Sequence, residues 1–389
     1  MSKPRLKIAV VGLGRRSNAH LPIIPVMADI FDFAAVCDVD AAVAERVGGQ
    51  YGVPYYSNIH DMLAKVKPDI VDLIVPGDAH HVVMHAVFAQ KAHMIVETPL
   101  AITLPACDLM IAEAKKAGVK IEVSENVWRF PQQRMHKAIL DSGIIGDPVR
   151  TYCVNTTGGY HAMNAIRIPA LGDATAVTGF TQERPVPLVT DHAGRRITTE
   201  HWVKGVFQFD NGVVGIHEGS NTYSSILRRE TPHFYRVDGS TGYVVNDDLW
   251  LARGSQATHY PLRYVTMQRN GVEVLERIEV ETDPPVVWAN PYAGRYALPA
   301  GHLAVAAALE SIYKAVVEDI EPEYGAWAGR IDQEMNMAMA ESALLGRSVA
   351  LPLTAVTSYE ERDQQRFKKE HGVAILDVDK LVDHMFPRL

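Results

Sequence analysis

The chain has few cysteines. Its 389 residues include only three, Cys37, Cys107 and Cys153, which lie far apart and are odd in number. That pattern offers neither a disulfide framework nor the close Cys/His spacing of a zinc site, and it is typical of a reduced, cytoplasmic protein. We therefore expect no metal site, and we expect the fold to depend on an ordinary apolar core.

Long runs of one residue class are also missing. No block of five or more basic residues occurs, and the formal net charge is −8, so we expect no nucleic-acid partner. No uninterrupted run of about 18 apolar residues occurs either, so we expect no membrane span. The apolar run after Lys7 is too short and too rich in glycine for a signal peptide.

The chain does have the balance of a globular protein, with 47% hydrophobic and 22% charged residues. Over residues 1–125, short apolar segments alternate with helical ones. Strands are expected at 6–11, 33–37, 70–75, 94–96 and 119–123, and helices from Gly14 to about Met27 and at 41–51, 80–91 and 105–117. This alternation predicts an α/β Rossmann domain, a parallel sheet covered on both faces.

The pattern changes over residues 126–352. A helix is expected at 131–142, strands at 149–154, 203–209, 213–218, 234–238, 242–245 and 262–266, and long helices at 301–319 and 326–345. The turn Asp210-Asn211-Gly212 indicates a hairpin. We expect a second, α+β domain with a mostly antiparallel sheet.

Two segments of the chain stand apart. Residues 167–200 are rich in Pro, Gly and Thr and are interpreted as a loop over the site. Residues 353–389 form a charged C-terminal extension, which we expect to be a loosely packed tail, with an oligomer arm as the alternative.

A dinucleotide signature follows the first strand. In Gly12-Leu13-Gly14, the first glycine permits a tight turn and the second lets a phosphate approach the backbone. Ser17 stands where a third glycine is usual. Asp38 ends the next strand, where a carboxylate accepts both ribose hydroxyls and repels a 2′-phosphate. We therefore predict NAD rather than NADP, with a plain turn role for Asp38 as the alternative.

Two arginines adjoin this turn. Arg15 and Arg16 either contact the pyrophosphate or are solvated. Their sequence position does not separate the two roles.

Several segments together resemble the glucose–fructose oxidoreductase / inositol dehydrogenase (Gfo/Idh/MocA) family. They are Val10-Val11-Gly12-Leu13-Gly14, Val36-Cys37-Asp38, Pro76-Gly77-Asp78-Ala79-His80, Lys91 to Pro99, Asp141 to Gly146, and Glu341 to Pro352. The resemblance implies an N-terminal Rossmann domain and a C-terminal domain with a large open sheet. It also implies sugar, glycoside or polyol substrates and a homodimer or homotetramer.

The chain departs from that family at its catalytic positions. The family's Glu-Lys-Pro motif is replaced by Glu97-Thr98-Pro99, so the lysine beside the nicotinamide is absent. In the family's second motif, Asp-x-Gly-x-His/Asp-x-x-Asp, Gly159 and His161 are in register. Thr157 and Asn164 replace the two aspartates.

His161 is therefore our candidate base, because histidine titrates near working pH. A structural hydrogen bond is the alternative. Tyr160 is either a proton donor or a packed aromatic. Thr98 cannot act as a charged acid or base but can hydrogen-bond the substrate or the nicotinamide amide. By the resemblance, Glu97, Pro76 and His81 lie near the cofactor.

Substrate contacts are expected just after the last Rossmann strand. Asn126 and Arg129 are candidates, together with Asn164 from the second motif, and Trp128 either stacks on a sugar or packs between domains. The pairs Arg195-Arg196 and Arg228-Arg229 are interpreted as solvated surface. If one pair faced the site, it would favour an anionic sugar.

Three functions remain open. The first is an NAD-dependent dehydrogenase of a sugar-like alcohol. The second is a redox-neutral, NAD-dependent glycosidase, whose relatives share the missing lysine and a Glu-Asn pair like Glu125-Asn126. The third is a non-catalytic NAD or sugar sensor.

Overall fold

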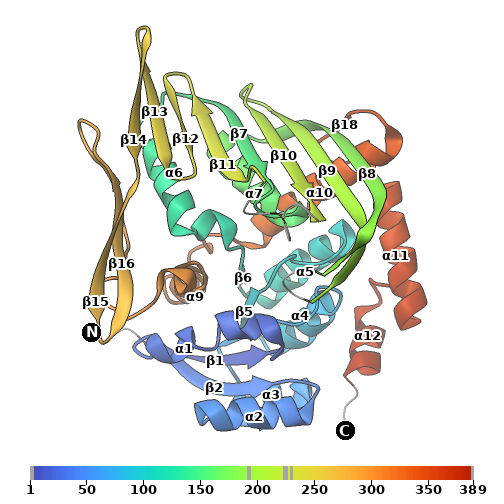
Figure 1. Cartoon of the computed structure of the whole chain (residues 1–389). Helices are drawn as coiled ribbons and strands as arrows, with labels where there is room; N and C mark the ends of the chain where they lie inside the picture. The colour runs from blue at the N-terminus through green and yellow to red at the C-terminus, as the bar shows by residue number, and fades with distance from the viewer. Residues whose placement is uncertain (1–3, 191–193, 222–226, 228–230, 387–389) are drawn as a thin grey trace.

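A computed structural model of the chain describes residues 4–190, 194–221, 227 and 231–386. One sheet of six strands and one of nine lie at opposite ends of the molecule, with helices α6, α7, α9 and α10 between them (Figure 1). A third sheet of three strands stands beside this arrangement. The predicted fold class, a Rossmann domain followed by a mostly antiparallel α+β domain, is confirmed.

The N-terminal sheet is entirely parallel, in the order β3-β2-β1-β4-β5-β6. Its strands are β1 (Leu6–Val11), β2 (Phe31–Cys37), β3 (Tyr55–Tyr56), β4 (Ile70–Leu73), β5 (His93–Val96) and β6 (Ile121–Val123). Its helices are α2 (Ala41–Tyr51), α3 (Ile59–Val66), α4 (His80–Phe88) and α5 (Leu104–Ala117). Strand β4 is buried along its whole length, because helices cover both faces of the sheet. Strand β3 and helix α3 are additions to the predicted set.

Local sequence explains where these helices begin and end. The side chain of Asp40 accepts hydrogen bonds from Ala42 and Val43 at the start of α2, and Asn58 caps α3 in the same way. Helix α5 ends at Gly118, whose φ of 71° is left-handed and suits glycine.

The segment after Gly14 is less helical than predicted. A five-residue 3-10 helix, η1 (Arg15–Ala19), is followed by the four-residue α1 (Ile23–Val26). Pro22 lies between them, and because proline lacks the N–H that a helix interior needs, no continuous helix forms. The helix dipole therefore contributes less at this turn than a long helix would.

The C-terminal sheet is antiparallel except for the pair β7 and β10, in the order β14-β13-β12-β11-β7-β10-β9-β8-β18. Its strands are β7 (Pro148–Val154), β8 (Ala174–Thr190), β9 (Arg196–Phe209), β10 (Val214–Ser220), β11 (Phe234–Gly239), β12 (Gly242–Val245), β13 (Asp248–Arg253), β14 (Gln256–Pro261) and β18 (Val349–Ala350). The helices are α6 (Pro131–Asp141), α7 (Gly159–Ala170), α9 (Leu303–Val317) and α10 (Ala326–Leu345). Helices α7 and α10 pack on strands β7 and β8.

The predicted loop at 167–200 is wrong. Residues 167–170 end helix α7, and residues 174–190 and 196–200 belong to strands β8 and β9, which pair with each other as a long hairpin. Pro185 and Pro187 led to the loop interpretation. Strand β8 pairs with β18 only at Ala176 and Val177, so beyond them it is an edge strand, where a missing N–H is tolerated.

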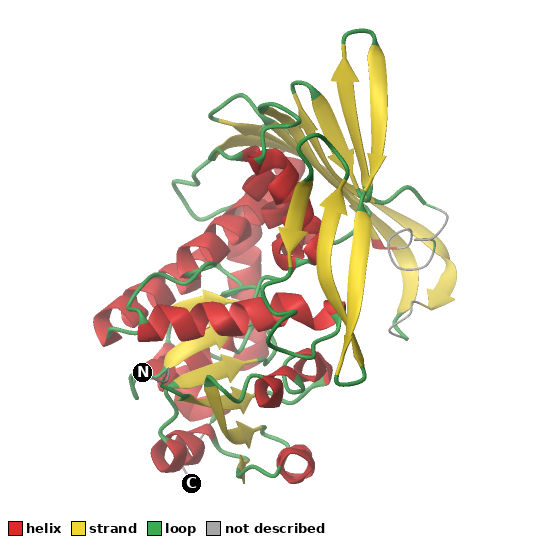
Figure 2. Cartoon of the chain, turned by 90° about the vertical axis from the view of Figure 1, so that its left-hand side faces the viewer, coloured by secondary structure: helices red, strands yellow, loops and turns green. Residues whose placement is uncertain are grey.

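A three-stranded sheet projects from the large one toward the N-terminal domain (Figure 2). It consists of β15 (Arg263–Arg269), β16 (Val272–Val280) and β17 (Val286–Ala289). Only the first of these strands was predicted. Strand β15 turns back into β16 through Asn270 and Gly271, both with positive φ.

The expectation of a loosely packed C-terminal tail is wrong. Helices α11 (Ser358–His371) and α12 (Val378–Met385) run down one side of the molecule onto the Rossmann domain (Figure 1). Phe367 and Leu381 are 2% and 0% exposed and belong to the core that contains helix α4. These apolar residues anchor an otherwise charged segment.

One stretch, Ala300–Val317, is long and apolar enough to cross a membrane by length and composition alone. It comprises α9 and the 3-10 turn before it, and 56% of it is buried inside the protein. Leu309 and Ile312 are fully buried in the core. Helices at the core of a folded domain pass the same test.

Candidate active site

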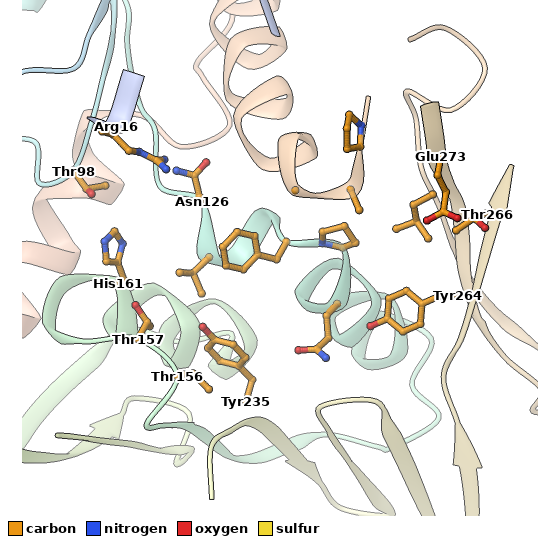
Figure 3. Close-up of a pocket in the computed structure, with 18 of the residues that line it drawn as sticks. Arg16, Thr98, Asn126, Thr156, Thr157, His161, Tyr235, Tyr264, Thr266 and Glu273 are labelled. Carbon is orange, nitrogen blue, oxygen red and sulfur yellow. The ribbon is translucent and has the colours of Figure 1, made fainter. Parts of the chain in front are cut away.

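A cleft of about 1260 Å³ opens between the carboxyl edge of the Rossmann sheet and the three-stranded sheet. Figure 3 shows Arg16, Thr98, Asn126 and His161 together on one side, and Tyr264, Thr266 and Glu273 on the other. We call these sides the near wall and the far wall. Thr156, Thr157, Tyr235 and the start of α6 lie between them.

The turn after β1 has the geometry that a dinucleotide needs. Gly12 has a φ of 90°, and a Cβ on it would lie 2.4 Å from the carbonyl oxygen of Ile74, so only glycine fits. A Cβ on Gly14 would meet nothing within 4 Å, which leaves space above the turn. Asp38 accepts hydrogen bonds from Leu13 N at 2.7 Å and from Asp40 N at 2.9 Å. Asp38 therefore also fixes this turn, and its two oxygens keep further acceptor capacity.

Asn126 brings an unsatisfied acceptor to the cleft. Its Nδ2 donates to Ser124 O at 2.9 Å, while its Oδ1 is buried without a partner within the described residues. A buried carbonyl oxygen without a donor costs free energy that a ligand N–H or O–H recovers. Together with the open space at Gly14, this atom shows that the near wall fits a dinucleotide.

A buried ionic network supports the near wall. Nδ1 of His20 lies 2.9 Å from Asp72 and its Nε2 lies 2.7 Å from Glu97, which also accepts from Arg16 Nε at 2.8 Å. Although burial lowers the pKa of His20, the two carboxylates raise it to about 9. Burial alone would raise the pKa of Glu97, but His20 and Arg16 bring it down to about 2. The network is thus ionised at neutral pH and fixes the residue before Thr98.

His161 forms a dyad with a buried carboxylate. Helix α7 begins at Gly159, after the turn that carries Thr156 and Thr157, and its first turn aims His161 into the cleft. Nδ1 of His161 lies 2.7 Å from Glu125 Oε2, and the Glu125 side chain is fully buried whereas that of His161 is 41% exposed. Since a carboxylate only accepts, Nδ1 carries the hydrogen in the neutral form of the ring, and Nε2 is then an acceptor.

Charge sets the basicity of that dyad. Burial lowers the pKa of His161, but the carboxylate of Glu125 outweighs burial and raises the pKa above its ordinary value. Glu97 raises this pKa further and Arg16 lowers it, so the ionic network acts on His161 as well. Glu125 is itself fixed, since its Oε1 accepts from Val127 N at 2.9 Å.

Tyr160, predicted as a second catalytic residue, is directed elsewhere. Its hydroxyl donates to Gly329 O of helix α10 at 3.2 Å, and the residue is 8% exposed. Burial raises its pKa well above the ordinary value. The catalytic prediction for Tyr160 is wrong, because this side chain points toward helix α10 while that of His161 points into the cleft.

The predicted substrate contacts of Trp128 and Arg129 are also wrong. The ring of Trp128 packs against Tyr324, and the Arg134 guanidinium lies 4.0 Å from its centre. Arg129 is 2% exposed and its Nη2 is 2.7 Å from Glu122 Oε1. The 3-10 turn at Val127–Arg129 directs both side chains into the contact between domains.

The predictions for Asn164 and His81 are also wrong. Asn164 is fully buried and donates to His161 O at 2.8 Å, so it supports the first turn of α7 instead of contacting the substrate. His81, predicted near the cofactor, is buried beneath Phe367 of the C-terminal helices, with ring centres 5.6 Å apart.

Other predicted positions lie outside the cleft lining. Pro76 precedes Gly77, which is packed against Pro99. Arg15 and Arg196 are exposed. Arg228 and Arg229 lie outside the described residues. The cofactor roles of Pro76 and Arg15 remain predictions.

Sequence reasoning did not identify His20, Asp72 or the far-wall residues as part of the site. His20 lies between the polar residues 15–18 and the apolar residues 21–27, and a lone histidine there was the available signal. Within residues 4–190, 194–221, 227 and 231–386, no group of three or more His, Cys, Asp or Glu side chains is placed to hold a metal.

Comparison with known proteins agrees with this geometry. Residues 6–125 match the model of the Gfo/Idh/MocA oxidoreductase family, described as having an NAD-binding Rossmann fold. Inositol 2-dehydrogenase from Salmonella typhimurium is 27% identical over 168 residues, 41% of this chain and 50% of that protein. D-apiose dehydrogenase from Rhizobium rhizogenes is 32% identical over 117 residues, 30% of this chain and 34% of that protein. The match thus spans half or less of each relative.

The likeness of fold extends further. The structure of a levoglucosan dehydrogenase in complex with NADH and levoglucosan superposes with a TM-score of 0.68, covering 90% of this chain and all of that one. The two sequences are 18% identical. This agreement confirms the two-domain architecture.

Proposed function

We propose that this chain, whose residues 6–125 match the Gfo/Idh/MocA oxidoreductase family, is an NAD-dependent enzyme that takes a hydride from a ring hydroxyl of a sugar, glycoside or polyol. The relatives named above are dehydrogenases of inositol, D-apiose and levoglucosan, which are all polyhydroxylated. The near wall is polar and suited to such a compound, with Arg16, Thr98, Asn126 and His161 along it.

NAD is the cofactor that the near wall suits best. Gly12 and Gly14 would receive the pyrophosphate, and Asp38 would accept the ribose hydroxyls and repel the 2′-phosphate of NADP. Oδ1 of Asn126 would accept a hydrogen bond from the bound ligand. When bound, NAD supplies the nicotinamide ring that accepts the hydride.

His161 acts as the general base in this proposal. Its Nε2 takes the proton of the hydroxyl while the C–H hydrogen of the same carbon leaves as hydride, which gives a carbonyl. Glu125 stabilises the imidazolium that forms and keeps Nδ1 protonated beforehand. Thr98 has a neutral hydroxyl and positions the substrate by hydrogen bonding.

The observation that carries this proposal is the His161–Glu125 dyad. A carboxylate with a fully buried side chain, 2.7 Å from a histidine that is open to the cleft, is the arrangement of a base with its orienting group. It stands on the same wall as Asn126 and Arg16, and Arg16 closely follows the glycine turn. Proton removal and hydride acceptance are therefore served from one side of the cleft.

A redox-neutral glycosidase is the second candidate. Thr98 replaces the lysine that dehydrogenases of the family use, and Glu125-Asn126 matches the Glu-Asn pair of its NAD-dependent glycosidases. In that reaction the new ketone acidifies the neighbouring C–H, a base removes that proton and the glycosidic group leaves. Water then adds and the hydride returns to the carbon, so no NADH accumulates.

One experiment tests both candidates. The protein is incubated with NAD and a panel of polyols and aryl glycosides, and both NADH absorbance and aglycone release are followed. Net NADH supports the dehydrogenase. Aglycone release without net NADH, abolished by stripping NAD, supports the glycosidase. If NAD binds but neither signal appears, both candidates are contradicted in favour of a sensor.

A further inference from the structure

The far wall has a different chemistry from the near wall. Thr266 on β15 and Leu275 on β16 are paired in register and face the cleft together with Tyr264 and Glu273. Phe130 and Pro131, at the start of α6, continue this surface toward the near wall. The far end of the cleft is thus largely apolar and aromatic.

Two aromatic rings on this surface are open to solvent. Tyr264 is 44% exposed and Phe130 is 40% exposed. Large apolar side chains exposed inside a concave site, with few polar groups among them, are typical of ligand pockets. Flat rings favour another ring as the ligand, because stacking adds to the gain from apolar burial.

The Tyr264 ring is also held in place. Its hydroxyl donates to Asp247 Oδ1 at 2.6 Å, and Gln132 Nε2 donates to the same oxygen at 2.8 Å. The ring is therefore fixed before a ligand arrives, which reduces the entropy lost on binding.

The charges that line the cleft disfavour a negatively charged ligand group at the far wall. Among the described lining residues, Glu273 is the one charged side chain of the far wall. Arg16, the lining arginine, lies on the near wall and is paired with Glu97, and His161 on the same wall is paired with Glu125. On the other face of β15, Arg263 pairs with Glu281 and Arg269 donates to backbone carbonyls.

We infer that the far wall is a second subsite, which receives a neutral aromatic aglycone, and that the substrate is an aryl glycoside. The sugar ring lies at the near wall beside His161, and its aromatic substituent lies against Tyr264, Phe130 and Leu275. Glu273 accepts a hydrogen bond from a hydroxyl on that substituent. This inference rests on the proposed function, because it assumes that the sugar occupies the near wall.

The test compares matched ligands on the NAD-loaded protein. Dissociation constants are measured calorimetrically for methyl and phenyl β-D-glucopyranosides, and for the corresponding galacto, manno and xylo pairs. We expect the phenyl member of the preferred pair to bind roughly tenfold more tightly, as stacking and apolar burial provide. Tyr264→Ala should remove most of that ratio, because the phenyl member loses the ring on which it stacks.

Met267→Ala is the matched control. Met267 is on the same strand, is 37% exposed and lies outside the lining of the cleft, because it points to the opposite face of β15. The phenyl-to-methyl ratio should survive in this variant. Equal binding of both glycosides to the wild type, or a ratio that persists in Tyr264→Ala, would overturn the inference.

The outcomes separate this inference from the proposed function. Turnover of free sugars or methyl glycosides without a phenyl preference overturns the subsite and leaves the function standing. A Tyr264-dependent phenyl preference without turnover supports the subsite and contradicts the function. If Tyr264→Ala instead changes the molar mass in solution and not the ratio, the far wall is a contact between copies of this chain and the inference fails.

Discussion

The two walls of the cleft differ in what lies behind their side chains. Behind the near wall the side chains of His20 and Glu125 are fully buried and that of Glu97 is 10% exposed, and each is bonded on both sides. On the far wall Tyr264 is 44% exposed, and its hydroxyl donates to Asp247. The near wall lies next to the buried parallel sheet. The far wall belongs to the three-stranded sheet, which projects from the large sheet toward the N-terminal domain (Figure 2).

This difference indicates a division of labour. Proton transfer needs groups held at fixed distances and protonation states, which burial and paired charges provide. Selection among substrates needs only a surface of suitable shape and polarity, which can change without disturbing the chemistry. We therefore expect changes on the near wall to affect every substrate, and changes on the far wall to affect only some.

The largest effect is expected from His161→Ala. Loss of a general base lowers kcat/KM by about 10²–10⁴-fold, on every substrate of the panel. His259→Ala is the matched control. Its side chain is 40% exposed and its Nε2 lies 2.6 Å from Asp248, so it is also a histidine–carboxylate pair, but on β14. Near-normal turnover in His161→Ala, with an unchanged melting temperature, would remove His161 from the chemistry.

The next effect is on stability. His20→Ala leaves Asp72 and Glu97 buried without their shared cation, which should lower the free energy of unfolding by about 3–5 kcal/mol. Thr266→Ala on the far wall should change it by no more than about 0.5 kcal/mol. Urea titrations of the two variants give this comparison directly.

The stabilisation by His20 also depends on pH. The pKa of His20 rises from 6.5 when unfolded to about 9 when folded. A raised pKa stabilises the fold fully below the unfolded value, and this contribution is lost as the pH rises through 9. A wild-type stability that increased over that range relative to His20→Gln would contradict the ionised network.

A smaller effect is expected at the cofactor end of the near wall. Asp38→Asn keeps an acceptor for Leu13 N but removes the charge. The preference for NAD over NADP should fall by roughly tenfold or more, because a charged hydrogen bond to ribose is lost and repulsion of the 2′-phosphate is relieved. Fluorescence titration with both cofactors measures the preference. Equal weakening of NAD and NADP would place Asp38 away from the ribose.

The smallest effect is a shift in pH dependence. The base must be neutral, so kcat/KM falls as the pH drops through the raised pKa of His161. Glu125→Gln removes the charge that raises this pKa, and the acid limb should move to lower pH. Tyr264→Ala on the far wall should leave the limb in place. An unmoved limb in Glu125→Gln would show that another group titrates.

Locally encoded features were the ones predicted correctly from sequence. Helices 41–51 and 326–345 match the structure end to end, because their periodicity and caps lie within the segment itself. The strand predicted at 203–209 is the second half of β9, but its first half and β8 were not predicted, since prolines that end most strands are tolerated at a sheet edge. The tail was misjudged because its few apolar residues, such as Phe367, are diluted among charges.

Among the site residues, too, those encoded by a local sequence pattern were the ones predicted. Gly12 and Asp38 belong to a turn whose spacing is visible in the sequence. The partners of His20 are 52 and 77 residues away, and Glu125 is 36 residues from His161, so no local pattern reveals them. Trp128 and Arg129 follow the last Rossmann strand, where ligands bind in such sheets, but a 3-10 turn directs both side chains to another surface, which confirms the packing alternative for Trp128.

The central claim is that this cleft removes hydride from a sugar-like hydroxyl. A single-turnover, stopped-flow measurement of NADH absorbance, with the protein and NAD mixed against the glycoside or polyol that binds most tightly, tests it most directly. We predict that the NADH band appears in the wild type, lasting if the enzyme is a dehydrogenase and transient if it is redox-neutral. It should be absent in His161→Ala loaded with the same NAD. Absence of the band in the wild type, with NAD and the ligand both bound, would contradict the claim.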